Sequence, residues 1–245
     1  MIILSVLLMV FLPLKALSGS GQAVDHSVYA DLLKKYVKDG VVNYRGFKEE
    51  ESRLDGYLKV LEKTDSKNLN RNEQFAFYIN AYNAWTIKLI LSKYPDIKSI
   101  KNLGTLFQSP WEKRICRIDG KGLSLDEIEH KILRPVFKDP RVHFALNCAS
   151  KGCPSLISEP YTGSHLGRQL DTSAQRFIHD PQKNYLQNET LFVSSIFKWY
   201  AQDFGNDIPG FFSRYASEGL GAKLAANSGK IKIVYLDYDW SLNGN

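Results

Sequence analysis

The sequence predicts an α+β fold, a helix-rich single domain in which a small, mainly antiparallel sheet packs on a buried central helix. Two observations predict this class. Helical periodicity covers most of the 245 residues, whereas the extended runs are short and mostly separated by helices. In addition, the longest regular segment, residues 70–95, is apolar on nearly every side, as expected for a helix inside a core.

The composition fits one globular domain of ordinary size. Hydrophobic residues make up 44% of the chain and charged residues 24%, with no internal repeat, low-complexity tract or long linker. The net charge is +6, and the basic residues are spread out, with only a mild concentration between Lys98 and Lys121. Nucleic-acid binders have a tighter basic stripe, so we expect no nucleic-acid partner and at most weak association with an anionic envelope surface.

The first 23 residues predict a secretory signal peptide. Their apolar run, residues 2–14, is too short to span a bilayer comfortably and gives way to small and polar residues, with cleavage expected after Ser18 or Ala23. No Lys or Arg precedes the run, so a retained anchor is the alternative. The first cysteine is Cys116, so we do not expect a lipoprotein. The expected mature domain, 24–245, is periplasmic or secreted.

Three helices are expected before residue 95. Two are amphipathic and cover about 27–38 and 47–63, with DGVVNYRG between them as a turn with a short extended piece. The third is the buried central helix, for which Asn70 and Glu73 predict the cap and Pro95 the end.

Two asparagines, Asn80 and Asn83, lie in the small-residue stripe of that central helix. Buried amides without hydrogen-bond partners are costly. We therefore interpret both side chains mainly as ties to neighbouring loops, with direct contact to a substrate as the alternative.

A hairpin and a short helix are expected next. The Asp-Gly pair at 119–120 separates two short extended runs, which is a recognised hairpin signal. Ser124 and Glu127 then form a capping box for a helix over 125–134, which Pro135 is expected to stop.

The remaining elements alternate between strand and helix. Alternating apolar residues predict a strand that contains His143, followed by a loop with two cysteines and a helix over about 164–179. TLFVSSIFKWYAQDFG predicts a strand with an aromatic helix behind it, and KIKIVYLDYDWSLN predicts a C-terminal strand.

Cys148 and Cys153 flank the short turn at the end of the expected strand. Loops at strand ends commonly present reactive side chains, so Cys148 is a candidate nucleophile, which needs a base and a third group that orients the base. A Cys148–Cys153 disulfide, redox-active or inert, and a metal site fit the same residues. The polar neighbours Asn147 and Ser150 slightly favour a free Cys148. Cys116 is interpreted as a small core residue.

Glu129 and His130 lie on the helix that precedes the cysteines. Glu129 falls within the apolar stripe, so it is either half of a core ion pair or a functional carboxylate that orients a histidine or acts as a base. His130 is the better candidate base for Cys148, because a regular strand would turn His143 away from that thiol. The other histidines, His26, His165 and His179, are interpreted as surface residues.

Five blocks of the sequence carry a family resemblance: FAFYINAYNAWTI, DEIEHKILRP, DPRVHFALNCASKGCPSL, SSIFKWYAQDF and YLDYDWSLN. From about Asn70 to Asn243 they resemble, in order, the hallmark blocks of the family known as domain of unknown function 547. The resemblance implies a stand-alone exported bacterial protein, since the plant members carry a coiled-coil segment that this chain lacks. The family-type positions are Asn80, Asn83, Glu129, His130, His143, Asn147, Cys148, Cys153, Trp199 and Asp203.

We therefore predict an exported thiol-dependent hydrolase or transferase that acts on an amide, peptide or thioester bond in a peptide or small molecule. In this hypothesis Cys148 attacks, His130 transfers the proton and Glu129 orients His130. Asn80 or a backbone N–H stabilises the oxyanion. The residues expected to bind substrate or support these groups are Asn83, His143, Asn147, Cys153 and Trp199. A papain- or transglutaminase-like architecture would fit this role by analogy.

Two alternatives stay open. The first is a non-catalytic envelope binding module in which a Cys148–Cys153 disulfide staples a loop and aromatic residues form the partner surface. The second is a metal-dependent hydrolase with His130, His143 and Glu129 around zinc. The sequence contains no apparent complete ligand set, so we expect neither a metal nor a cofactor.

Overall fold

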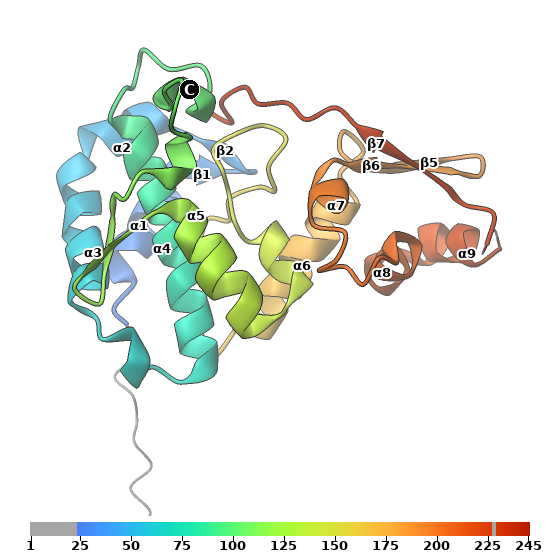
Figure 1. The fold of residues 1–245 in the computed structure, drawn as a ribbon, viewed down its shortest axis with the longest axis horizontal. Helices are drawn as coiled ribbons and strands as arrows, with labels where there is room; N and C mark the ends of the chain where they lie inside the picture. Colours follow the sequence, from blue (N-terminus) through green and yellow to red (C-terminus); the bar gives the residue numbers. More distant parts are fainter. Residues whose placement is uncertain (1–23, 227–228) are drawn as a thin grey trace, which may run out of the picture.

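The computed structural model describes residues 24–226 and 229–245, and the predicted signal segment, 1–23, lies outside the described residues. Two lobes lie side by side (Figure 1). One contains the N-terminal helices around α4, and the other contains strands β5 to β7 with helices α7 to α9. Within the described ranges, no helix has the length and apolar character needed to cross a membrane.

The N-terminal lobe is built around the predicted central helix. Its elements are α1 (Ser27–Tyr36), β1 (Val37–Lys38), β2 (Val41–Val42), α2 (Tyr44–Glu49), α3 (Glu51–Lys63) and α4 (Arg71–Leu91). The Asn70 side chain accepts hydrogen bonds from the backbone N–H groups of Asn72 and Glu73, which confirms the predicted cap. Helix α4 is buried on nearly all sides from Phe75 onward, as its apolar sequence predicts.

Both asparagines of α4 tie loops to the central helix, as their main interpretation predicted. The Asn80 side chain donates to the Tyr161 carbonyl at 2.8 Å and accepts from the Tyr161 N–H at 2.9 Å. The Asn83 side chain donates to the Ala145 carbonyl at 2.9 Å and accepts from the Asn147 N–H at 2.8 Å. Because each amide satisfies two backbone groups, the two loops are held in a fixed register against α4.

The predicted hairpin and capping box are confirmed, but the following helix is longer than expected. Strands β3 (Cys116–Ile118) and β4 (Lys121–Leu123) pair antiparallel, and α5 (Leu125–Glu127) begins at the Ser124 cap. A π-helix, η4 (Ile128–Phe137), then runs through Pro135 and ends at Lys138, whose φ is 55°. Proline crowds the preceding turn of an ordinary α-helix, and the wider turn of a π-helix accommodates that crowding.

The predicted strand at His143 is wrong. Residues Pro140–Phe144 form a short 3₁₀ helix, η5, in which the Asp139 side chain accepts from the Arg141 N–H. An acceptor followed by proline at the first position is a helix-start signal, and here it overrides the apolar alternation. The alternation has another cause, because Val142 packs in the first core and Phe144 in the second.

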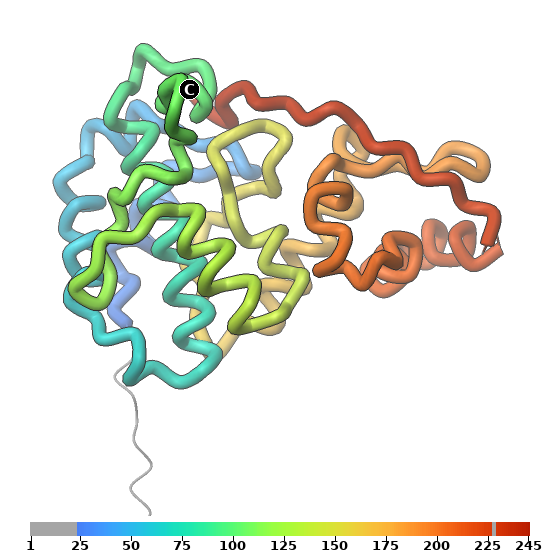
Figure 2. The backbone as a smooth tube through the Cα atoms, viewed as in Figure 1, coloured from blue at the N-terminus to red at the C-terminus, as the bar shows by residue number. Residues whose placement is uncertain are grey.

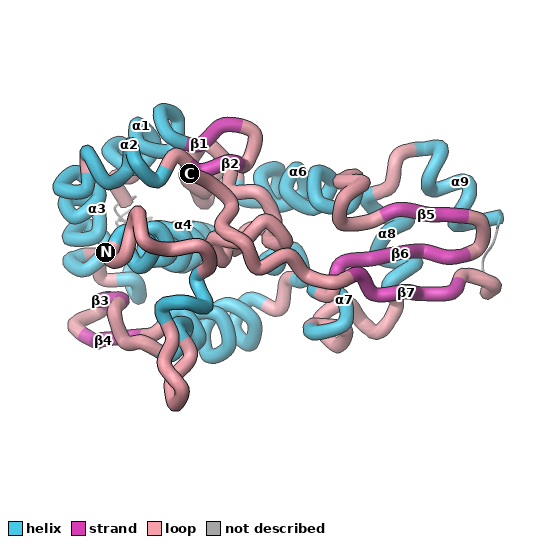
Figure 3. The backbone as a smooth tube through the Cα atoms, turned by 90° about the horizontal axis from the view of Figure 1, so that it is seen from above, coloured by secondary structure: helices cyan, strands magenta, loops and turns pink. Residues whose placement is uncertain are grey.

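The C-terminal lobe has its own aromatic core. It also holds the largest sheet of the described residues, formed by β5, β6 and β7 (Figure 3). Its elements are α6 (Leu166–Ile178), β5 (Tyr185–Gln187), β6 (Thr190–Ser194), α7 (Ile196–Trp199), α8 (Ile208–Tyr215), α9 (Glu218–Ala226) and β7 (Lys232–Leu236). Strands β5 and β6 are antiparallel, whereas β6 and β7 are parallel. The fold is therefore α+β as predicted, but the described residues form three small sheets in place of the single expected one.

The C-terminal tail connects the two lobes. After β7 it runs back across the top of the molecule to the N-terminal lobe (Figure 2). There Leu242 donates its N–H to the Lys98 carbonyl, and Asn245 donates its N–H to the Val42 carbonyl. This return places the residues just after β7 over the junction between the lobes, where the cysteine loop also lies.

His26 is buried rather than on the surface, contrary to the sequence interpretation. Only 8% of it is exposed, and its Nδ1 lies 2.8 Å from the Tyr57 hydroxyl. Burial lowers the pKa of His26 to about 4. The folded state therefore favours the neutral imidazole, because the charged form would lack its hydration in this buried site.

We expect acid to destabilise the fold through His26. Its folded pKa lies below its ordinary value of about 6.5, so its neutral form contributes stability that is complete above that pH. This stability falls as the pH drops toward 4, by at most about 3 kcal/mol. Urea unfolding of the His26→Gln variant between pH 7 and 4 should show a flatter pH dependence than wild type. Identical slopes would contradict the assignment, and His165→Gln, on the surface, is the control.

Candidate functional site

A pocket of about 240 Å³ lies where the two lobes meet. Helix α4, η4 and the cysteine loop contribute one side, and α7 and the C-terminal tail contribute the other. The lining residues are Tyr82, Ser109, Trp111, Asp126, Glu129, His130, His143, Leu146, Cys148, Cys153, Pro154, Ile196, Trp199, Tyr200, Tyr238 and Trp240. Both histidines, the carboxylate and both cysteines singled out from the sequence therefore meet in one cavity.

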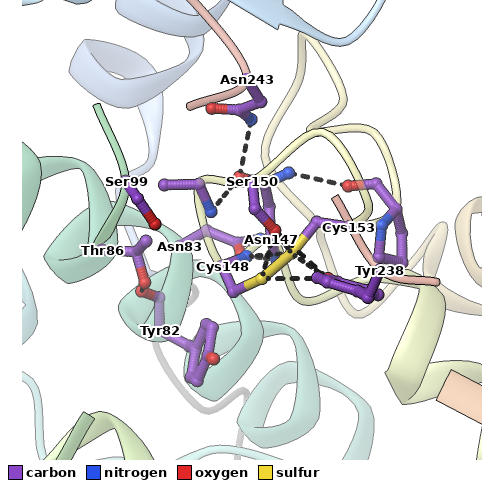
Figure 4. Close-up of a disulfide and its surroundings, with 12 residues drawn as sticks. Tyr82, Asn83, Thr86, Ser99, Asn147, Cys148, Ser150, Cys153, Tyr238 and Asn243 are labelled. Carbon is purple, nitrogen blue, oxygen red and sulfur yellow. Dashed lines mark hydrogen bonds between the residues drawn. A yellow bond between two sulfur atoms is a disulfide. The ribbon is translucent and has the colours of Figure 1, made fainter. Parts of the chain in front are cut away.

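Cys148 and Cys153 form a disulfide at one wall of this pocket (Figure 4). Of the states that the sequence left open, the structure has the bridge, not the free Cys148 that we slightly favoured. Cys148 is partly exposed, whereas Cys153 is only 4% exposed. The Cys153 sulfur accepts the Cys148 N–H at 2.8 Å and lies 3.1 Å from the Tyr238 hydroxyl, which points at the bridge.

The turn before the disulfide is held by Asn147. Its side chain donates to the Pro154 carbonyl at 2.7 Å and accepts from the Ala149 N–H at 3.0 Å. Ala149 has a φ of 62°, in the left-handed region that a non-glycine residue seldom adopts. Asn243 of the C-terminal tail also donates to Asn147 at 3.1 Å. Asn147 and Asn83 thus hold the cysteine loop through hydrogen bonds to its backbone (Figure 4).

Asn80 does not reach the pocket. Its amide is occupied by the Tyr161 backbone, and it is absent from the pocket lining. In this position Asn80 ties the Tyr161 loop to α4, and it is not placed beside Cys148 in the pocket lining.

His143 is buried and pairs with the partly exposed carboxylate of Asp203. Its Nε2 donates to the Asp203 carboxylate at 2.7 Å, and its ring stacks on Tyr200 with 3.9 Å between the centroids. Arg134 donates two hydrogen bonds to the same carboxylate, at 2.6 and 3.2 Å. The His143 hydrogen bond, followed by those of Arg134, holds the pKa of Asp203 well below its ordinary range. Nδ1 of His143 makes no hydrogen bond to a described residue.

His130 has both ring nitrogens engaged. Arg134 Nη1 donates to its Nδ1 at 2.8 Å, and its Nε2 faces the Asp126 carboxylate at 3.4 Å. An arginine only donates, so Nδ1 of His130 is the acceptor nitrogen in this arrangement. The lone pair that a base needs is therefore already in use.

Glu129 is buried, and its partner is a tyrosine. The Tyr200 hydroxyl donates to the Glu129 carboxylate at 2.7 Å. Burial, and then the nearby Glu129 charge, raise the pKa of Tyr200 above its ordinary value. No lysine or arginine among the described residues forms an ion pair with Glu129, so the core ion pair considered from the sequence is not present.

Aromatic rings form the outer wall of the pocket. Trp240 lies 5.8 Å from both Trp111 and Trp199, and 4.5 Å from Tyr238, between ring centroids. Lys101 places its ammonium 3.7 Å from the Trp240 ring centroid, within cation–π distance. Trp199, which the sequence assigned to binding, is 47% exposed at this wall.

One family model matches part of the chain. Residues 66–178 match the model described as protein of unknown function, DUF547. This segment is a DUF547 domain. It extends from the approach to α4 through the hairpin, η4 and the cysteine loop to the end of α6. No curated protein and no solved structure matches the chain, so the papain- or transglutaminase-like architecture stays an analogy.

The pocket is only partly contained in the DUF547 segment. Glu129, His130, His143 and the two cysteines lie within it, whereas the lining residues Trp199, Tyr200, Tyr238 and Trp240 come from the chain that follows. Asp203, which does not line the pocket but binds His143, also comes from that later segment. The later segment therefore completes the site by supplying the carboxylate for His143 and most of the aromatic wall.

In the described part of the chain, no three His, Cys, Asp or Glu side chains are grouped so that they could hold a metal ion. His130, His143 and Glu129 all line the pocket, and each has a partner among the protein side chains. Among the described residues, these three side chains do not form a ligand set for the zinc-dependent alternative.

Sequence reasoning missed several members of the site. Neither the two tyrosines, Tyr200 and Tyr238, nor Arg134 was singled out from the sequence. The family resemblance pointed to Asp203, but nothing in the spacing linked it to His143, which lies 60 residues earlier. The usable signal was Asp203 itself, the acidic residue within the aromatic block SSIFKWYAQDF.

Proposed function

We propose that the pocket is the active site of a thiol-dependent hydrolase or transferase that acts on an amide, peptide or thioester bond. Cys148, once reduced, is the nucleophile. The observation that supports this most is that the Cys148 sulfur shares the pocket with His143, whose Nε2 is fixed by Asp203 while Nδ1 has no described partner. A nucleophile, a base and a group that orients the base are the parts that such chemistry requires.

The proposed base is His143 rather than His130. Asp203 fixes the Nε2–H tautomer of His143, which leaves a lone pair on Nδ1 to take the Cys148 proton directly or through one water. The thiolate attacks the carbonyl carbon, and His143 returns the proton to the departing amine or thiol. Water or a second acceptor then releases the acyl group from Cys148 with the same proton transfers in reverse.

The other polar groups of the pocket have supporting roles in this proposal. Glu129 and Tyr200 form a hydrogen-bonded pair beside His143 and are available to bind a polar part of the substrate. The pocket volume of about 240 Å³ is below the ~300–1,000 Å³ of sites for drug-sized ligands. A small acyl group or a single residue of a longer chain therefore fits better than a large substrate.

Release of the nucleophile requires reduction of the bridge. An external thiolate attacks the more accessible Cys148 sulfur and forms a mixed disulfide, and Cys153 leaves as a thiolate. The Cys148 N–H and the Tyr238 hydroxyl already point at the Cys153 sulfur and would stabilise that charge. A second thiol frees Cys148, so two thiols become one disulfide. The proposed location, periplasmic or secreted, permits both states.

A second candidate function is a non-catalytic binding module. The bridge itself favours it, because a disulfide beside a wall of tryptophan and tyrosine rings is also a suitable scaffold for a ligand surface. In this function the disulfide persists, and the reactivity of its sulfurs plays no part.

Alkylation of the full-chain protein separates the two functions. After mild reduction we expect iodoacetamide to modify Cys148 at pH 7 faster than an ordinary thiol of pKa about 8.5. Cys116 should react only after unfolding, because burial raises the pKa of its thiol far above the ordinary value. Peptide mapping by mass spectrometry gives both rates. A Cys148 that reacts no faster than free cysteine, or a bridge that resists glutathione, favours the binding module.

A further inference from the structure

The loop 104–109 presents two large apolar side chains to solvent. Leu106 is 91% exposed and Phe107 is 92% exposed, whereas no other exposed large hydrophobic residue in the described ranges exceeds 55%. Isolated exposed hydrophobic residues are ordinary, but an adjacent and almost fully exposed Leu-Phe pair is not. We call this pair the apolar tip. The proposed chemistry uses neither side chain.

The turn that carries the apolar tip is fixed by hydrogen bonds. The Thr105 hydroxyl accepts from the N–H groups of Phe107 and Gln108 at 3.3 and 3.0 Å. Thr105 also donates its own N–H to the Gln108 carbonyl at 2.9 Å. A turn closed in this way holds Leu106 and Phe107 at its apex, and no described residue buries either side chain.

Cations and tryptophans lie at the base of the same loop. Lys101 sits over the Trp240 ring, and Trp111 contacts that ring from the other end of the loop. Lys98 and Lys113 flank the loop and form no ion pair with a described residue, while Glu112 is engaged by the Ser109 N–H at 3.0 Å. Tryptophan and lysine beside an exposed apolar segment are typical of the interface between a bilayer and water.

We propose that the apolar tip inserts into an anionic lipid bilayer, with Lys98, Lys101 and Lys113 at the level of the headgroups. A bilayer accepts a two-residue apolar point without a complementary pocket, whereas an ordinary protein interface takes about 20–30 residues a side. The lysines match an anionic headgroup layer, because each basic residue near such a surface strengthens binding.

Insertion would also orient the pocket. Ser109 and Trp111, at the end of the same loop, line the pocket, so its mouth would face the membrane surface. This consequence rests on the proposed function, because it places the substrate at that surface. Insertion of the tip does not depend on the reaction and can be tested without it.

The test measures quenching of a tryptophan placed at the tip. Full-chain Phe107→Trp is mixed with vesicles of phosphatidylglycerol and phosphatidylcholine that carry brominated acyl chains, and its emission is compared with wild type. Val41→Trp, at an exposed site elsewhere, is the matched control. We expect the added emission of Phe107→Trp, but not that of Val41→Trp, to be quenched. This readout reports the loop itself, whatever the N-terminal segment does.

Two further variants test the forces involved. Leu106→Ser with Phe107→Ser should lower vesicle affinity about a hundredfold through lost apolar burial. Lys98→Gln with Lys113→Gln should weaken binding to anionic vesicles and reduce its salt dependence. Unquenched Phe107→Trp on bound protein, or unchanged affinity of the double serine variant, would overturn the proposal. The proposal would also be overturned if, without vesicles, the double serine variant had a lower oligomeric state than wild type. That result would show that a second copy of the chain covers the apolar tip.

Discussion

Replacement of Asn83 by alanine is expected to lower the free energy of unfolding by about 4 kcal/mol, because it leaves two buried backbone groups without partners at roughly 1–3 kcal/mol each. The groups are the Ala145 carbonyl and the Asn147 N–H, both next to the cysteine loop. Alanine can neither donate to the Ala145 carbonyl nor accept from the Asn147 N–H. Urea unfolding at pH 7 measures the loss.

Asn72→Ala is the matched control, since Asn72 is exposed on the same helix and its side chain makes no hydrogen bond to a described residue. Its effect should stay within about 0.5 kcal/mol. A loss below 1 kcal/mol for Asn83→Ala would show that water or loop movement satisfies the two backbone groups, and that α4 does not fix the cysteine loop.

Replacement of His143 by glutamine is expected to slow acyl transfer by the reduced protein about 10²–10⁴-fold, the usual contribution of a general base. Glutamine keeps a donor for the Asp203 carboxylate but cannot accept a proton. Phenyl thioacetate serves as the acyl donor, and release of thiophenol is followed by absorbance. Asp203→Asn should lower the rate less and shift the pH profile, because Asp203 acts only through the His143 ring.

His130→Gln separates the two histidines that line the pocket. Because Arg134 and Asp126 engage both ring nitrogens of His130, we expect this variant to change the rate only slightly. A loss for His130→Gln that equals or exceeds the loss for His143→Gln would restore the assignment made from the sequence. Thermal unfolding of each variant shows whether a lower rate reflects a damaged fold.

Local signals were sufficient to predict much of the fold. The Asn70 cap, the Asp-Gly hairpin and the Ser124 capping box each depend on residues within a few positions of one another, and all three are confirmed. The structural roles of Asn80 and Asn83 also followed from a general rule, since a buried amide must be paired.

Errors arose where distant parts of the chain decide the outcome. The alternation around His143 looked like a strand because Val142 and Phe144 pack into two different cores, which one sequence cannot distinguish from two faces of a sheet. His26 looked exposed because its cover, Tyr57, comes from another helix. Asp203 and Tyr238 enter the site only through the second lobe and the returning tail. Such pairings depend on topology, not on spacing.

The central claim is that reduced Cys148 is an acyl acceptor, and trapping of the acyl intermediate tests it most directly. Reduced full-chain protein is mixed with phenyl thioacetate, quenched in acid and analysed by intact-mass spectrometry and peptide mapping. We expect one acetyl group on Cys148 of the reduced wild type. Acetylation should be absent from Cys148→Ser and from the disulfide form, and it should be much slower in His143→Gln. Equal acetylation of wild type and Cys148→Ser, or acetylation of Cys148 that His143→Gln does not slow, would contradict the central claim.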